Sequence, residues 1–484
     1  MANKVAELIF IPIPGVGHIM STIGMAKVLV NRDQRLSITV LIISPPFTSL
    51  ALATYIDSLA KNAIERIRFI ELPHDESAPK LNPKAPFTSF REYVDSHSKY
   101  VRNIVADMKN QPHFGHLVGF VVDILSSTMI DVANEFNVPT YVFFTSNAAF
   151  LGFKVYMETL CADQNQDYVI ELSKAEGEIL LPSFVKPVPT KVLPQVYQTE
   201  DGMDFLMYSI RKMREAKAIL VNTFLELETH AIKSFSKTNF PPVYPVGPIL
   251  NLDGVAGKSD DKDVITWLDD QPPSSVVFLC FGSIGCFEEV QVKEIAYGLE
   301  RSGYRFVWSL RRPPLATQSF KVLPDDFADP GAVLPDGFLE RTKGIGKVIG
   351  WAPQVAMLDH PAVGGFVSHC GWNSMLESLW FGVPVATWPI YTDQQMNAFE
   401  MVVELGLAVE IKMDYQNNVF NPEGDMVIIT AEEIERGIRH LMVDDEVRTK
   451  VKEMSRLSRA SVTKGGSSYA SVGCLVQDFT SNIT

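Results

Sequence analysis

Short apolar runs rich in branched residues alternate along this chain with stretches long enough to form helices. This pattern restricts the fold more than any other feature, because it is typical of βαβ units that build a parallel sheet. In the first half of the chain the runs lie at 8–13, 37–43, 66–72, 117–122 and 140–144. In the second half they lie at 275–281, 304–310, 347–349, 362–367 and 383–387. The pattern predicts an α/β protein with two doubly wound parallel sheets.

The expected division of the chain follows from its length and from a proline-rich stretch. At 484 residues the chain is too long for one ordinary core. Residues 241–263 contain many prolines and polar turn formers, so the two sheets are expected to separate there. A second proline-rich stretch, 180–194, is expected to form a long loop. We expect domains at 1–248 and 264–460, a linker at 249–263, and a helix at 461–484 that packs back on the first domain.

The overall charge and the cysteines argue against several functions. A net charge of −14 leaves no positive field that could follow a nucleic acid. The five cysteines lack the paired spacing of zinc or redox sites, which favours a reducing compartment. The apolar run at 8–13 has no cleavage site after it, and no run reaches the length of a membrane span. We expect a cytoplasmic monomer that binds no nucleic acid and does not span a membrane.

The first functional motif is a glycine turn that ends in His18. Gly15 and Gly17 directly follow the first predicted strand, and ligands of open α/β sheets bind at such strand ends. His18 is a candidate general base because imidazole titrates near neutral pH, although a core or capping histidine is the alternative. Asp123 follows another predicted strand and could orient the imidazole, although aspartate there often caps a helix. Met20 stands where a dinucleotide-binding turn needs a third small residue, which argues against a nicotinamide cofactor.

The strongest signal is the segment 351–394. It contains a predicted strand at 363–367, a turn at 368–374 and a helix from 375 to 381. The free N–H groups and the dipole of a helix start can hold a pyrophosphate without a basic cluster. The polar side chains expected at this site are those of His369, Asn373 and Ser374, together with Ser283, which follows another strand.

Three features of the sequence have competing interpretations. Glu377 can bind ribose hydroxyls, or it can complete a capping box with Ser374. Trp351 can stack on a flat base, or it can belong to the core. Asp261 and Asp263 have the DxD form of some metal sites, but they fall in the predicted linker and are expected to be a solvated charge run.

Together these motifs resemble those of a known family. The segment 351–394 is similar in length, order and nearly every characteristic residue to the signature box of plant family-1 UDP-glycosyltransferases. The PGVGH turn at 14–18 and the FGS turn at 281–283 stand in the family's order and spacing, so the likeness covers the whole chain. The resemblance implies a GT-B fold, in which two Rossmann-like domains face each other across a cleft. The first would bind the acceptor and the second the nucleotide sugar.

The resemblance also implies roles for individual residues. Those implied to bind uridine are Trp351 and the Ala352 backbone, which hold uracil, and Gln354 and Glu377, which hold the ribose. Those implied to bind the pyrophosphate are Ser283, His369, Asn373, Ser374 and also Ser21, which stands where many relatives have proline. Helix capping is an equal alternative for Ser21. Those implied to bind the sugar are Asp393, Gln394, Thr145 and the backbone of Trp372. The acceptor is expected to lie against Gly15, Phe150 and Phe184.

The reaction implied by the resemblance is an inverting transfer of glucose from UDP-glucose, because Gln394 is similar to the residue of glucose users. His18 would take the proton of the acceptor hydroxyl while Asp123 stabilises the imidazolium. Flavonoids, simple phenolics and other plant secondary metabolites are the expected acceptors, with terpenoids and carboxylic acids as alternatives. No metal or cofactor is expected besides UDP-glucose as co-substrate. An oxidoreductase and a non-catalytic carrier are alternatives that Met20 and the intact pair of His18 and Asp123 disfavour.

Overall fold

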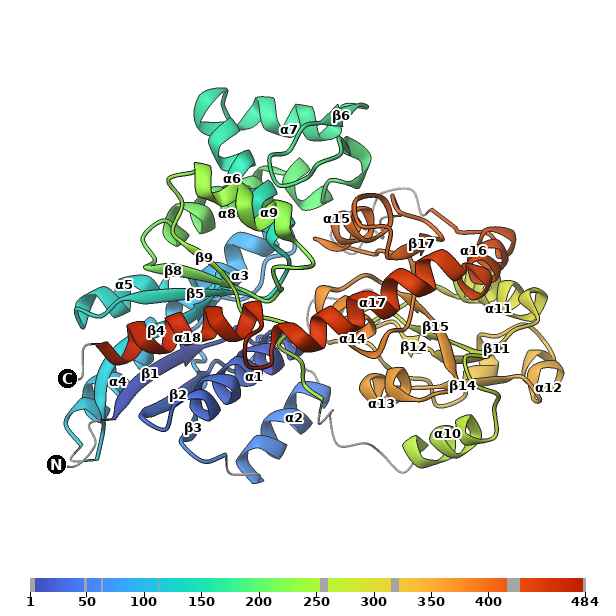
Figure 1. Ribbon diagram of the computed structural model, residues 1–484, viewed down its shortest axis with the longest axis horizontal. Helices are drawn as coiled ribbons and strands as arrows, with labels where there is room; N and C mark the ends of the chain where they lie inside the picture. Colours follow the sequence, from blue (N-terminus) through green and yellow to red (C-terminus); the bar gives the residue numbers. More distant parts are fainter. Residues whose placement is uncertain are drawn as a thin grey trace.

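The chain folds into two halves, each built on a parallel sheet (Figure 1). The computed structural model describes residues 5–47, 50–61, 64–111, 113–252, 260–314, 322–415 and 427–481. The strand order is β3-β2-β1-β4-β5-β8-β9 in the first sheet and β14-β11-β10-β15-β16-β17 in the second. This arrangement confirms the predicted α/β class with two doubly wound halves.

Most strands lie within a few residues of the predicted runs. The first sheet consists of β1 (Ala6–Ile11), β2 (Leu36–Ile42), β3 (Ile67–Glu71), β4 (His116–Asp123), β5 (Thr140–Phe144), β8 (Ala218–Val221) and β9 (Val243–Pro245). The second consists of β10 (Val276–Cys280), β11 (Arg305–Ser309), β14 (Gly346–Ile349), β15 (Val363–Ser368), β16 (Val385–Thr387) and β17 (Ala408–Glu410). Two small antiparallel pairs are β6 (Glu178–Ile179) with β7 (Val188–Pro189), and β12 (Arg311–Arg312) with β13 (Asp325–Asp326).

Helices connect the strands and cover the sheets. Those of the first half are α1 (Val16–Arg32), α2 (Leu50–Lys61), α3 (Pro86–Ser96), α4 (Ser98–Lys109), α5 (Met129–Glu135), α6 (Ala148–Asp163), α7 (Gln166–Lys174), α8 (Glu200–Met213) and α9 (Thr229–Ser234). Those that follow are α10 (Asp260–Asp269), α11 (Glu289–Ser302), α12 (Phe338–Thr342), α13 (Gln354–Asp359), α14 (Trp372–Phe381), α15 (Gln394–Phe399), α16 (Ala431–Val443), α17 (Asp445–Ser461) and α18 (Ser467–Thr480).

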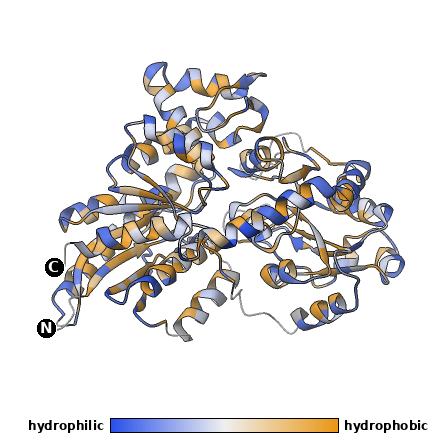
Figure 2. Cartoon of the chain, in the orientation of Figure 1, coloured by the Kyte–Doolittle hydropathy of each residue, from blue (hydrophilic) through white to orange (hydrophobic). Residues whose placement is uncertain are grey.

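The central strand β1 shows why its sequence reads as a continuous apolar run. Leu8 and Phe10 belong to one buried cluster, and Ile9 and Ile11 belong to another. A strand alternates its side chains between the two faces of a sheet, so both faces of this sheet are covered. Figure 2 shows the same hydrophobic colouring along the strands of the first half.

Two proline-rich stretches contain more regular structure than predicted. The stretch 180–194, expected to be a loop, includes β7, whose Val188 pairs with Ile179 of β6. The stretch 241–263 includes β9, which pairs with β8 at the sheet edge, where proline is tolerated because one side needs no ladder hydrogen bonds. Neither β8 nor β9 was predicted, because both runs are short.

The predicted linker and its DxD sequence are only partly described. Residues 253–259 of the linker lie outside the described residues. Asp261 and Asp263 fall in α10, which begins at Asp260, so the predicted linker 249–263 overlaps the start of a helix. Among the residues that the structure describes, no group of three or more His, Cys, Asp or Glu side chains is arranged to hold a metal ion.

The last two helices connect the two halves. Helix α17 packs against α14 of the second half, and α18 packs on the first half (Figure 1). The ring of Phe479 in α18 contacts Tyr141 of β5 edge to face, with 4.7 Å between ring centroids. The Tyr141 hydroxyl also donates a hydrogen bond to Asp478. Within the described ranges, no helix has both the length and the apolar character that crossing a membrane requires.

Candidate functional site

His18, Asp123 and Thr145 come together at the carboxyl ends of β1, β4 and β5. The His18 Nδ1 atom lies 2.7 Å from Asp123 Oδ2 and 3.1 Å from Thr145 Oγ1. The Asp123 side chain is fully buried, whereas that of His18 is 33% exposed. Because Nδ1–H donates to the carboxylate, the neutral imidazole carries its lone pair on Nε2, which can accept a proton.

Asp123 both contacts His18 and caps a helix. Its Oδ1 accepts a hydrogen bond from the Leu125 N–H at 2.9 Å and so caps the short 3₁₀ helix Ile124–Ser126. The Ser126 hydroxyl accepts in return from the Asp123 N–H at 3.0 Å. These bonds fix the carboxylate, so that Oδ2 is held toward His18.

The charges around His18 favour its protonated form. Burial lowers the pKa of the imidazole, but the negative charge and hydrogen bond of Asp123, with the more distant charge of Asp393, outweigh it. The net result is a pKa above the ordinary value of 6.5. Such an imidazole is a stronger base than one in water and holds a proton more readily once it has received it.

The turn after β15 leads into α14 three residues earlier than predicted. Cys370 has a left-handed φ of 64°, and Gly371 is the N-cap, so the helix begins at Trp372. The first N–H groups of a helix have no partner within it, and here they belong to the residues expected to bind pyrophosphate. The capping-box interpretation of Ser374 and Glu377 is wrong, because Ser374 lies inside the helix.

The residues expected to bind the ribose contact one another. The Gln354 Nε2 atom donates to Glu377 Oε2 at 2.6 Å and to Ser374 Oγ at 2.9 Å. Burial raises the pKa of the Glu377 carboxyl to about 7, although the hydrogen bond from Gln354 opposes the shift. Glu377 therefore changes charge near neutral pH.

His369 stands between two glycine turns. A Cβ on Gly282 or on Gly371 would lie 2.5 Å from His369 Nε2, so both positions need glycine for the imidazole to fit. Gly282 also has a left-handed φ of 74°. Burial lowers the pKa of His369 to about 4, so the ring is neutral at pH 7. Ser283 directly follows Gly282 and brings its hydroxyl to the same turn.

Trp351 is held by two residues that the sequence analysis did not single out. Its backbone N–H donates to Asp326 Oδ1 at 2.8 Å, and the Arg311 guanidinium carbon lies 5.0 Å from the centroid of its ring. Trp351 is half-buried, so the core interpretation does not describe it fully. Ala352, next in the chain, is 7% exposed.

Asn373 at the start of α14 touches the glycine turn of the first half. Its Nδ2 donates to the Gly17 carbonyl at 3.2 Å, and its Oδ1 accepts from the Ser21 hydroxyl at 3.1 Å. Ser21 therefore does not cap a helix but contacts the other half. The Trp372 indole N–H donates to the Asn222 carbonyl at 2.6 Å.

Asn222 was missed by the sequence analysis. Its Nδ2 donates to Asn373 Oδ1 at 3.3 Å, and its Oδ1 accepts from the Ile249 N–H at 2.7 Å. It directly follows the unpredicted strand β8. A polar residue at the end of that short apolar run was the signal that could have found it.

Two of the residues expected to bind the sugar are linked to the dyad, because Thr145 contacts His18 and the charge of Asp393 acts on it. Asp393 Oδ2 accepts hydrogen bonds from the Ser146 hydroxyl at 2.5 Å and from Asn397 Nδ2 at 3.1 Å. Thr392 before it has a left-handed φ of 56°, which bends the chain there. Gln394 Oε1 accepts from the N–H groups of residues 390 and 391, so its amide orientation is fixed.

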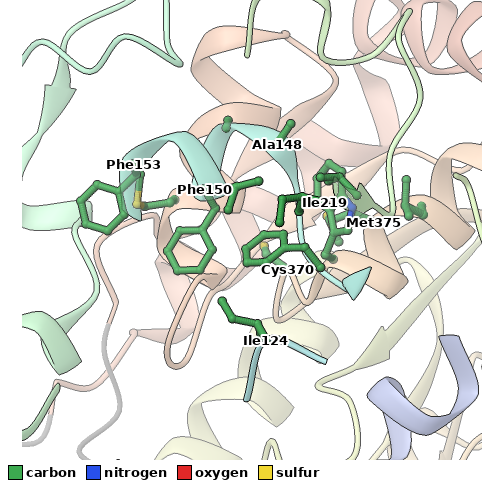
Figure 3. Close-up of a cluster of buried hydrophobic side chains, with 14 of the residues drawn as sticks. Ile124, Ala148, Phe150, Phe153, Ile219, Cys370 and Met375 are labelled. Atoms are coloured by element: carbon green, nitrogen blue, oxygen red, sulfur yellow. The ribbon is translucent and has the colours of Figure 1, made fainter. Parts of the chain in front are cut away.

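The three residues expected to contact an acceptor lie in three different surroundings. Gly15 is the N-cap of α1, close to His18. Phe150 is 6% exposed and stacks on Phe153, with 5.8 Å between centroids (Figure 3). The Phe184 ring instead packs edge to face on Phe399 of α15, at 5.7 Å, in the contact between the two halves.

Comparison with known proteins shows the family of this chain. The model of the family described as UDP-glucoronosyl and UDP-glucosyl transferase matches residues 50–457. The chain belongs to this family. It is therefore a UDP-glycosyltransferase, and its two sheets are the two halves of a GT-B fold.

Relatives of this UDP-glycosyltransferase match it from end to end. UDP-glucose flavonoid 3-O-glucosyltransferase 6 of Fragaria ananassa is 50% identical over 97% of this chain and 98% of its own. UDP-glycosyltransferase 71A15 of Malus domestica is 49% identical with the same coverage. The crystal structure of Medicago truncatula UGT71G1 complexed with UDP-glucose is 39% identical, with a TM-score of 0.86 over 99% of both chains. That of a Siraitia grosvenorii transferase in complex with UDP is 44% identical, with a TM-score of 0.85 over 98% of this chain and 99% of its own.

Proposed function

We propose that this UDP-glycosyltransferase moves glucose from UDP-glucose to a hydroxyl of a small apolar acceptor, with inversion at the anomeric carbon. The observation that carries the proposal is the contact of Asn373 with Gly17 and Ser21. It holds the helix start that suits a pyrophosphate against the turn that carries His18. We further propose that the enzyme acts as a cytoplasmic monomer that needs no metal or other cofactor.

His18 acts as the general base in the proposed mechanism. Its Nε2 takes the proton of the acceptor hydroxyl as that oxygen attacks the anomeric carbon from the face opposite UDP. The imidazolium that forms is stabilised by Asp123, whose carboxylate already raises the pKa of the ring. The start of α14 receives the negative charge that develops on the UDP leaving group.

The donor lies mainly along residues of the second half in this proposal, and Thr145 of the first half reaches its sugar. Uracil stacks on Trp351 and bonds to the Ala352 backbone, while Gln354 and Glu377 hold the ribose. The pyrophosphate is bound by Ser283, His369, Asn373 and Ser374. The glucose is bound by Asp393, Gln394, the Trp372 backbone and Thr145. Ser21 positions Asn373 through the hydrogen bond between their side chains.

Two relatives are named as flavonoid glucosyltransferases, and these names support an aromatic acceptor. Gly15 lies close to His18, and Phe150 lies in one cluster with Ile124, the chain neighbour of Asp123 (Figure 3). Both are proposed to contact the acceptor. Phe184 supports the contact between the halves and is proposed to shape the acceptor site only indirectly. Phenolics and flavonoids are therefore preferred over terpenoid alcohols.

A screen of donors against acceptors tests the proposal. UDP-glucose, UDP-galactose and UDP-glucuronate are each incubated with a panel of flavonoids, simple phenols and terpenoid alcohols, and products are read by mass spectrometry and by the anomeric proton coupling. We expect β-glucosides of phenolic hydroxyls from UDP-glucose. Retained anomeric configuration, or preference for another donor, would contradict the proposal.

Donor affinity should depend on pH through Glu377. Its pKa of about 7 in the free protein means that it is half-protonated near neutral pH. Ribose hydroxyls donate to the ionised carboxylate, so binding favours the deprotonated form and releases a proton. We expect the Kd for UDP-glucose to fall as pH rises through 7 and to level off above it, and to rise by up to about tenfold per pH unit below it.

Calorimetric titration with UDP-glucose between pH 5.5 and 8.5 measures this dependence. UDP-glucose is used as the titrant instead of UDP, because the terminal phosphate of UDP itself titrates near pH 6. The control is Glu377→Gln, which cannot ionise and should give a flatter profile with weaker binding at high pH. An equally steep profile in that variant would assign the dependence to another group.

A further inference from the structure

Lys154 is a buried cation for which the described part of the chain provides no anionic partner. It lies in α6, the helix that begins directly after the residues that touch His18 and Asp393. The side chain belongs to a residue only 4% exposed. Among the described residues, its Nζ atom forms no hydrogen bond within 3.5 Å and no ion pair with a carboxylate within 4.0 Å. An ammonium on a largely buried side chain costs free energy when it has no partner.

Aromatic rings surround the Lys154 ammonium instead. Its Nζ lies 5.4 Å from the centroid of Phe150 and 5.7 Å from that of Tyr197. Ring faces offset part of the cost of a buried cation. Burial raises the pKa of the Tyr197 hydroxyl, so this phenol stays neutral and cannot neutralise the lysine.

The carboxylates near Lys154 are engaged elsewhere. Glu158, one helical turn further along α6, pairs with Arg214 at 2.7 Å. Asp123 holds His18, and Asp393 holds the hydroxyl of Ser146. The charges of Asp393 and Asp123 do reach Lys154 through space, but burial outweighs them and lowers its pKa to about 8. The side chain is thus still mainly protonated at pH 7.

The face of α6 that carries Lys154 points toward the reacting groups. Phe150 lies one turn before Lys154 on the same face of the helix. Figure 3 shows Phe150 in one cluster with Ile124 and Cys370, the chain neighbours of Asp123 and of His369. The charges of Asp393 and Asp123 both act on Lys154, so its ammonium lies near the carboxylates of the proposed active site.

We propose that Lys154 is a specificity-determining residue that binds an anionic oxygen of the acceptor, such as a carboxylate, at the end remote from the hydroxyl that receives glucose. The inference rests on the proposed function. A ligand anion would neutralise the charge that the protein leaves unpaired, and a charge-assisted hydrogen bond in such a site is strong. The acceptor class is then a phenol that carries a second, acidic group.

A matched pair of acceptors tests this role. 4-Hydroxycinnamic acid and its methyl ester are compared as substrates of the wild-type enzyme and of Lys154→Met and Lys154→Arg, with the phenolic glucoside measured. We expect Lys154→Met to raise KM for the acid by about tenfold to a hundredfold and to change KM for the ester by less than about threefold. Lys154→Arg should keep most of the preference for the acid.

Stability and donor binding separate this role from a structural one. Removal of an unpaired buried charge should leave the Tm of Lys154→Met unchanged or higher, and the Kd for UDP-glucose should stay near that of the wild type. An equal loss with acid and ester, a lower Tm, or no change with either acceptor would overturn the proposal. If the wild-type enzyme glucosylates neither acceptor nor any other phenol, the proposed function fails instead.

Discussion

His18→Ala is expected to lower kcat by about a hundredfold to ten-thousandfold while the Kd for UDP-glucose stays within about twofold. The imidazole is the group that would accept the proton of the acceptor hydroxyl, and loss of a positioned base has an effect of this size. UDP-glucose binding should persist, because the donor is expected to lie on the start of α14 and on Gln354 and Glu377. Steady-state kinetics with a saturating phenol and calorimetric titration with UDP-glucose measure the two quantities.

The dependence of kcat/KM on pH is a second test of His18 as the general base. With UDP-glucose saturating at every pH, the wild-type kcat/KM for the acceptor should fall as pH drops through a pKa above 6.5, because the imidazole must be neutral to act as a base. This acidic limb should disappear in His18→Ala. His440→Ala is a matched control, because the side chain of His440 in α16 is 57% exposed and pairs with Asp444 just after that helix. Turnover in His18→Ala close to that of this control would exclude His18 as the base.

The parallel sheets could be predicted because hydrophobic burial on both faces leaves a clear pattern in the sequence. The run at 140–144 has the same bounds as β5, and the run at 347–349 misses one residue of β14. The glycine turn with His18 and the acid at Asp123 could also be placed, because both follow apolar runs. Strand ends in a doubly wound sheet meet at one edge, and this geometry brought the pair together.

The rest of the site depends on contacts between distant segments, which no local pattern encodes. Helix α14 begins at Trp372 because Cys370 takes a left-handed φ and Gly371 caps the helix, and neither choice follows from helix propensity. Asn222 bridges the halves from the end of a strand too short to recognise. Lys154 could be seen in the sequence as a single lysine in the apolar run 148–157, but its lack of an anionic partner became evident only in the folded structure.

Asp123→Asn should lower kcat by about a hundredfold or more without unfolding the protein. An amide can still accept the Leu125 N–H through Oδ1, so the cap of the 3₁₀ helix is preserved. The change removes the negative charge that raises the pKa of His18 and stabilises the imidazolium. The acidic limb of kcat/KM should therefore move to lower pH as kcat falls, and these two shifts together are the signature of a lost carboxylate.

Ser126→Ala separates this effect from the structural role of Asp123. It removes the hydroxyl that accepts from the Asp123 N–H and donates to the Ile11 carbonyl, at a cost of about 1 kcal/mol, but leaves the carboxylate on His18. Its Tm should fall while its pH profile keeps the position of the wild type. If Asp123→Asn instead lost Tm to the same extent and its acidic limb did not move, the carboxylate would serve the fold alone. The charge beside His18 would then have no part in the transfer of the proton.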